Sequence, residues 1–77
     1  MNAAEAQEVK NSLLQGNDQY RQLADKHHEL DIRLHELAEK HYLSVTEEIE
    51  EVTLKKRKLA LKDQMEEIAR HFRDRAS

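Results

Sequence analysis

The sequence contains no cysteine, no proline and no tryptophan, and it has one glycine among 77 residues. Without cysteine, neither a disulfide nor a thiolate metal site can stabilise the chain. A core built from fewer than about 80 residues seldom contributes more than a few kcal/mol. The scarcity of helix-interrupting residues, together with 38% charged residues, therefore predicts long helices stabilised by packing and self-association.

Charge and hydropathy disfavour two further classes of protein. The net charge is −3, whereas a protein that binds duplex DNA needs a clear basic excess. No stretch approaches the roughly 18 apolar residues of a membrane span, and the first ten residues lack the apolar core of a signal peptide. We therefore expect a cytoplasmic protein without a membrane-spanning segment.

The first expected helix covers about residues 3–15, which are good helix formers. Gly16 suits the position after a helix end, because glycine accepts a positive φ without steric cost. Asn17 or Asp18 is a suitable N-cap for the next helix. We predict a break at Gly16, with one continuous helix as the alternative.

The second expected helix covers about residues 18–42 and is followed by a short turn at about 42–46. Ser44 and Glu47 have the S-x-x-E spacing of a capping box, which marks the start of a third helix. A short turn between two helices favours an antiparallel hairpin. The helix carries a stripe with the alternating three- and four-residue spacing of a helix-packing seam: Tyr20, Leu23, His27, Leu30, Leu34, Leu37 and His41.

The third expected helix, about residues 46–73, has two apolar faces that one partner helix cannot cover. The first face comprises Val45, Ile49, Val52 and Leu59. The second face comprises Leu54, Leu61, Met65, Ile68 and Phe72, and we take it as the candidate interaction surface. The chain is thus predicted to be an all-α, coiled-coil-like helical hairpin with a short N-terminal helix, dimerising into a four-helix bundle.

Two motifs match in order along the expected hairpin. An aromatic residue and then K-H-x-x-L-D are provided by Tyr20, His27, Leu30 and Asp31. The pattern L-K-K-x-K-L-x-L-K-D follows, provided by Leu54, Lys55, Lys56, Lys58, Leu59, Leu61, Lys62 and Asp63. Over about residues 13–70 the chain resembles the YdcH-type family of small bacterial proteins. The resemblance implies a cytoplasmic helical hairpin but no catalytic residue, because the family's function is unknown. The turn HYLSVTEE departs from the glycine- or aspartate-rich link expected there.

Several histidines raise the question of a metal site or a pH response. His27, His28, Asp31 and His35 include i,i+4 pairs, but neighbouring side chains on a helix diverge, and a third ligand would have to come from the third helix, where Asp63 is a candidate. We favour seam and surface histidines over a metal site, and we predict no metal and no cofactor. If His27 and His41 are buried in the seam, their protonation near pH 6 would loosen it.

The basic band at Lys55, Lys56, Arg57, Lys58 and Lys62 is the remaining candidate for a binding site. Four consecutive residues fan around a helix, so the band forms no flat phosphate-binding face; Asp31 and Glu29 of the second helix are candidates to pair with it. No residue has the setting of a catalytic nucleophile. We therefore expect a non-enzymatic protein-interaction or regulatory adaptor module that forms a homodimer. The alternative is a small RNA- or DNA-associated regulator that uses the basic band.

Overall fold

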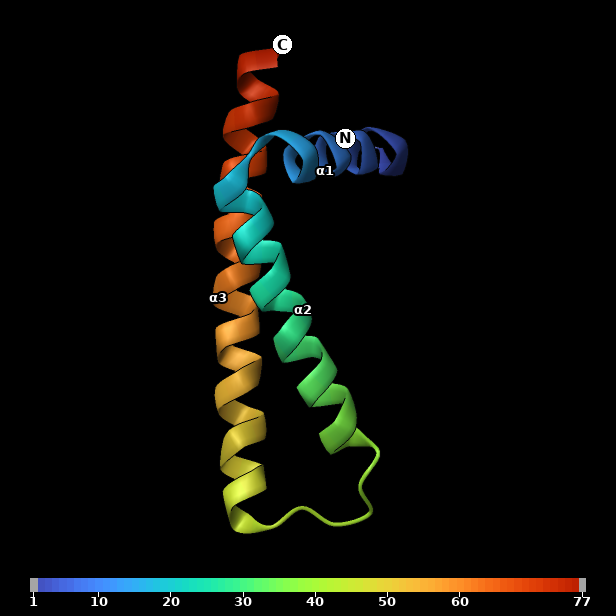
Figure 1. Ribbon diagram of the computed structural model, residues 1–77, viewed down its shortest axis with the longest axis vertical. Helices are drawn as coiled ribbons and strands as arrows, with labels where there is room; N and C mark the ends of the chain where they lie inside the picture. Colours follow the sequence, from blue (N-terminus) through green and yellow to red (C-terminus); the bar gives the residue numbers. More distant parts are fainter. Residues whose placement is uncertain (1, 77) are drawn as a thin grey trace.

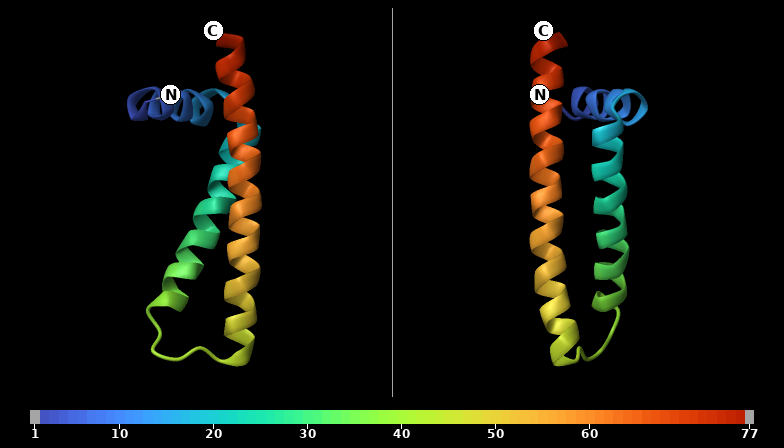
Figure 2. Two further views of the ribbon diagram at one scale, coloured as in Figure 1. Left: turned by 180° about the vertical axis from the view of Figure 1, so that it is seen from behind. Right: turned by 60° about the vertical axis from the view of Figure 1, so that its left-hand side comes forward.

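Three helices make up residues 2–76, the part of the chain that this computed structural model describes. They are α1 (Ala3–Gly16), α2 (Asp18–Ala38) and α3 (Val45–Ala76). Helices α2 and α3 form an antiparallel hairpin that widens toward its linker, and α1 crosses the other end of the hairpin (Figures 1 and 2). The predicted all-α hairpin with an N-terminal helix is thus confirmed.

The break between α1 and α2 lies at Asn17. Gly16 is the last residue of α1 and its φ is not positive, so the predicted role of glycine as a left-handed cap is wrong. Asn17 is extended instead, and its backbone N–H donates to the Leu13 carbonyl. Its side-chain oxygen accepts a 2.8 Å hydrogen bond from the Tyr20 backbone N–H, which caps the start of α2.

The second helix ends at Ala38, earlier than the sequence predicts, and residues 39–44 form the linker. The stripe position after Leu37 is His41, which is polar and exposed, so further helix would bury no apolar side chain. The assignment of His41 to the seam is therefore wrong. The capping box is confirmed: Ser44 Oγ accepts from the Glu47 backbone N–H, and the Glu47 carboxylate accepts from the Ser44 backbone N–H.

The core is a thin seam shared by all three helices. Its least exposed members are Leu37, near the end of α2, which is 1% exposed, and Leu13 of α1, which is 2% exposed. Leu13 therefore fixes α1 on the hairpin by burial, because a hidden leucine contributes about 1.5–3 kcal/mol. The buried apolar side chains of the described residues are Leu13, Tyr20, Leu23, Leu37 and Leu54.

Only one apolar face of α3 is covered within the chain. Leu54 is buried, and Leu61, Met65 and Ile68 are half-buried. This is the face assigned from the sequence to contacts between molecules, and the structure corrects that assignment, because these side chains complete the seam. Phe72, the last member of this face, is 38% exposed. The opposite face of α3 is left uncovered.

Candidate interaction surface

The uncovered face of α3 carries four apolar residues, which we call the apolar strip. On an α-helix with 100° per residue these residues point about 140–180° away from Leu54, and hence away from α2. The strip spans 14 residue steps, or about 21 Å at 1.5 Å per residue. Its members and their exposed fractions are Val45 (72%), Ile49 (62%), Val52 (52%) and Leu59 (60%).

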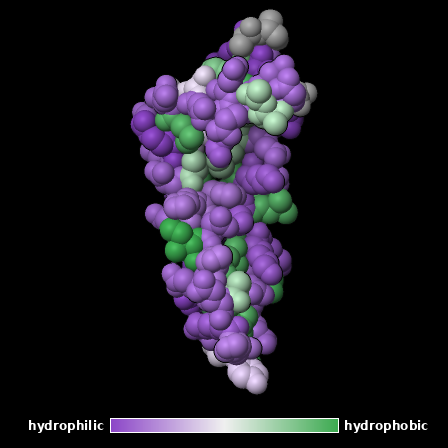
Figure 3. Space-filling model, turned by 90° about the vertical axis from the view of Figure 1, so that its right-hand side faces the viewer, coloured by the Kyte–Doolittle hydropathy of each residue, from purple (hydrophilic) through white to green (hydrophobic). Residues whose placement is uncertain are grey.

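The strip differs from scattered surface leucines and valines because its members share one helix face. Single exposed apolar residues are normal on a soluble protein, whereas a contiguous apolar patch marks a contact site. Hydrophilic residues surround the apolar patches on the face of the molecule that Figure 3 shows. On α3, Glu48 is exposed at the edge of the strip, and Lys56 is exposed between Val52 and Leu59.

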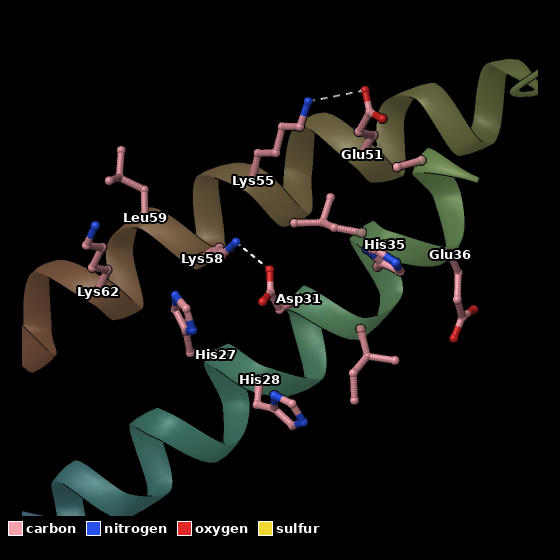
Figure 4. Close-up of a pocket in the computed structure, with 13 residues that line it drawn as sticks. His27, His28, Asp31, His35, Glu36, Glu51, Lys55, Lys58, Leu59 and Lys62 are labelled. Carbon is pink, nitrogen blue, oxygen red and sulfur yellow. Dashed lines mark hydrogen bonds and ion pairs between the residues drawn. The ribbon is translucent and has the colours of Figure 1, made fainter. Parts of the chain in front are cut away.

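A groove of about 720 Å³ runs between α2 and α3 where the hairpin widens. Its α2 side includes His28, Ile32 and His35, and its α3 side includes Lys55, Leu59 and Lys62. Figure 4 shows the Lys58–Asp31 ion pair bridging the two helices beside His27. Leu59 thus belongs both to the strip and to the rim of this groove.

The residues that have metal-ligand spacing in the sequence lie together along this groove. His27, His28, Asp31 and His35 all line the groove. Within residues 2–76, however, no three His, Cys, Asp or Glu side chains converge closely enough to hold a metal ion. Asp31 is instead directed to Lys58, whose ammonium lies 2.5 Å from its carboxylate oxygen. The described residues therefore offer no set of converging ligands in support of a metal site.

The side chains of the basic band point to different sides of α3. Lys55, Lys58 and Lys62 line the groove described above, whereas Arg57 lines a separate groove with Leu30 and Leu61. Lys58 pairs with Asp31, as predicted from the hairpin register, and Lys55 lies 3.5 Å from Glu51. The band therefore consists of dispersed and partly neutralised cations.

Two further ion pairs hold the hairpin: one joins α2 to α3, and the other joins the linker to the start of α3. Arg33 binds Glu50 through both side-chain oxygens, with N–O distances of 2.8 and 2.9 Å. Lys40 pairs with Glu47 next to the linker. Sequence reasoning missed the Arg33–Glu50 pair, because the register set by Asp31 and Lys58 places Arg33 opposite Lys56 rather than Glu50. Exposed pairs contribute little stability, but a two-oxygen pair is directional and fixes the alignment of the helices.

These pairs shift the pKa of each carboxylate downward. The Lys58 ammonium lowers the pKa of Asp31, first by hydrogen bonding and then by its charge. The Arg33 guanidinium lowers the pKa of Glu50, and Glu50 in turn raises the pKa of Arg33. Hydrogen bonds from Lys40 and from the Ser44 backbone lower the pKa of Glu47 to about 2. All three carboxylates are therefore charged near neutral pH and hold the hairpin ends together.

No helix within the described residues is both long and apolar enough to cross a membrane. A protein-family model described as "Protein of unknown function (DUF465)" matches residues 21–69. This span contains the K-H-x-x-L-D motif of α2, the linker and the L-K-K-x-K-L-x-L-K-D motif of α3. No curated protein and no solved structure is significantly similar to the chain.

Proposed function

The chain belongs to the DUF465 family, a family of unknown function that includes the YdcH-type proteins, and from this premise we propose a non-enzymatic protein-interaction or regulatory adaptor module. The observation that carries this proposal is the apolar strip of α3, which the chain leaves exposed along one face. A small chain with few buried side chains gains stability by covering such a face. Association through the strip is therefore the activity that its surface supports best.

The composition of the strip supports a protein partner in an aqueous compartment. Its exposed apolar side chains offer burial, and the adjacent charges of Glu48 and Lys56 offer orientation. The histidines and carboxylates that line the groove between α2 and α3 form no convergent group of three within residues 2–76, and Asp31 is engaged in the ion pair with Lys58. We accordingly propose binding without catalysis and a cytoplasmic location.

The alternative of RNA or DNA binding has weaker support. Phosphate backbones are bound by unpaired cations that face one way. Here Lys58 and Lys55 are paired with Asp31 and Glu51, and Arg57 lines a different groove. We therefore place protein association ahead of nucleic-acid binding.

Site-specific photocrosslinking in the native host tests the proposal. A photoreactive amino acid at Val52 reports on the strip, and one at Gln64, exposed on the same helix, serves as the matched control. We expect covalent protein adducts from Val52 and few from Gln64. The adducts should disappear when Ile49→Lys places a charge in the strip. Equal adducts from both positions, or none from Val52, would refute association through this face.

A further inference from the structure

We propose that the apolar strip is covered by the strip of a second copy of this chain, with the two α3 helices antiparallel about a twofold axis at Val52. This inference rests on the proposed function, because it names the partner that the exposed face binds. The proposed dimer surface differs from the one that the sequence favoured, because Leu54 and its neighbours pack within the hairpin.

Three of the four strip positions are symmetric in sequence about Val52, whereas the counterpart of Ile49 is Lys55. Val45 lies seven residues before Val52 and Leu59 lies seven residues after it. A twofold axis at Val52 thus places Val45 of one copy against Leu59 of the other, and Val52 against its own counterpart. Because the α2 contact occupies the opposite side of α3, each hairpin can form this contact without rearranging.

The charges that flank the strip favour an antiparallel arrangement. Glu48 lies four residues before Val52 and Lys56 lies four residues after it, so the same axis brings each against the other. A parallel arrangement would instead place Lys56 beside Lys56 and Glu48 beside Glu48. Opposite charges across an interface fix its orientation, and like charges suppress the wrong alignment.

Both flanking residues are available for such contacts. Glu48 and Lys56 are exposed, and neither forms an ion pair with any residue between positions 2 and 76. The acidic residue before Val52 and the basic residue after it are therefore complementary when two copies meet in the antiparallel arrangement.

The expected complex is weak. A standard interface uses roughly 20–30 residues on each side, whereas the strip contributes four apolar side chains and their charged neighbours. We expect a dimer with a dissociation constant between about 10 μM and 1 mM, in the range of transient contacts.

Sedimentation equilibrium of the purified full-length chain, from about 10 μM to 1 mM, tests whether a second copy of the chain covers the strip. Wild-type protein should approach a dimer mass as the concentration rises. Val52→Lys should raise the dissociation constant at least about tenfold, because it opposes two lysines at the axis. Gln64→Lys is the matched control, since Gln64 is exposed on the same helix and points about 120° away from Val52, so this variant should leave the dimer unchanged. Circular dichroism should show native helix content for both variants.

A charge exchange tests the antiparallel alignment. Glu48→Lys and Lys56→Glu should each weaken self-association, because like charges then meet twice across the axis. An equimolar mixture of the two variants should restore association, because the mixed dimer pairs opposite charges at both places. Arg57→Glu changes the net charge as much as Lys56→Glu does, but Arg57 lines the groove with Leu30 and Leu61 and should have a smaller effect.

Three results would overturn the inference: a monomer at the highest concentration, a dimer unaffected by Val52→Lys, or a charge-exchanged mixture that fails to restore association. A monomeric purified chain with Val52 crosslinks to a different protein in cells would overturn the second copy as occupant and leave the proposed function standing. A dimer that forms through the strip in solution, with no Val52 adduct in cells, would support pairing of the strip with a second copy and would overturn the proposed function in the cell.

Discussion

Replacing Leu54 with alanine should destabilise the protein far more than the same replacement at Leu59. Both leucines lie in the middle of α3, five residues apart, so their helix propensity and distance from the helix ends are similar. They differ in burial: Leu54 is 9% exposed and faces α2, whereas Leu59 is 60% exposed on the opposite side. The comparison therefore measures which face of α3 completes the core.

The expected magnitudes follow from these exposed fractions. Truncating a buried leucine to alanine costs about 2–5 kcal/mol, because the transfer free energy is lost and a cavity remains. The hairpin seam is thin and can partly collapse, so we expect about 2–3 kcal/mol for Leu54→Ala. Full burial of leucine contributes about 1.5–3 kcal/mol, and Leu59 has two-fifths of its surface covered, so Leu59→Ala should cost at most about 1 kcal/mol.

Urea unfolding followed by circular dichroism at low micromolar concentration measures both free energies of unfolding. The low concentration keeps the chain monomeric, so association through Leu59 does not contribute. For a chain of this size total stability is about 4–12 kcal/mol, and Leu54→Ala should shift the midpoint clearly. A cost for Leu59→Ala equal to or larger than that for Leu54→Ala would refute the assignment of the inner face.

Other predictions concern the caps, the pH response and nucleic acid. Asn17→Ala, which removes the acceptor for the Tyr20 backbone N–H, should cost about 0.5–2 kcal/mol in thermal or urea unfolding, and Asn17→Gly should cost less; equal costs would contradict the capping role. The pKa of Glu47 is lowered from 4.5 to about 2, so its contribution to stability is present above pH 4.5 and is lost as the pH falls toward 2. Unfolding of Glu47→Gln should therefore depend less on pH in that window, and an unchanged slope would contradict the Lys40 pair. A gel-shift titration with short RNA and DNA should show no binding at low salt; a shift that is lost when residues 55–58 are replaced by alanine would favour the nucleic-acid alternative.

Local chemistry explains which parts of the fold could be predicted from the sequence. The capping box of Ser44 and Glu47 depends on four consecutive residues and is confirmed. The stripe of α2 is confirmed where it carries large apolar side chains, as at Tyr20, Leu23 and Leu37, which are buried. The family resemblance, which depends on two spaced motifs, is confirmed as well. In each case the residues that decide the outcome are neighbours or share one helix face.

The predictions that failed depend on how one helix meets another. Periodicity alone does not say which of two apolar faces of α3 turns inward. The side of α3 that carries the ion pairs decides it: Glu50 and Lys58 pair with Arg33 and Asp31, and each lies four residues from Leu54 and therefore shares its face. Val52 and Leu59 lie within the same stretch of α3 but on its opposite face. These ion pairs join residues that are far apart in the sequence, so helical periodicity could not identify the inner face.

The end of α2 illustrates the same limit. His41 continues the three-four spacing, so a periodic pattern extends the helix beyond Ala38. A helix end, however, depends on the free energy that one more turn would gain from packing. A further turn that carries the polar imidazole of His41 would gain little. The linker of residues 39–44 must also cross the wide end of the hairpin, and extended residues cross a gap with fewer peptide units than a helix does.

The exposed strip is best understood by asking what its side chains would do in an isolated hairpin. Val45, Ile49, Val52 and Leu59 contribute little to the seam, and β-branched residues are weak helix formers, so helix propensity alone does not favour valine or isoleucine there. Polar residues at these positions would serve an isolated hairpin equally well and would improve its solubility. The same positions carry the spacing of a packing seam and are flanked by charges that change sign about their midpoint. Burial against another helix accounts for both features, and self-pairing accounts for the symmetry between them.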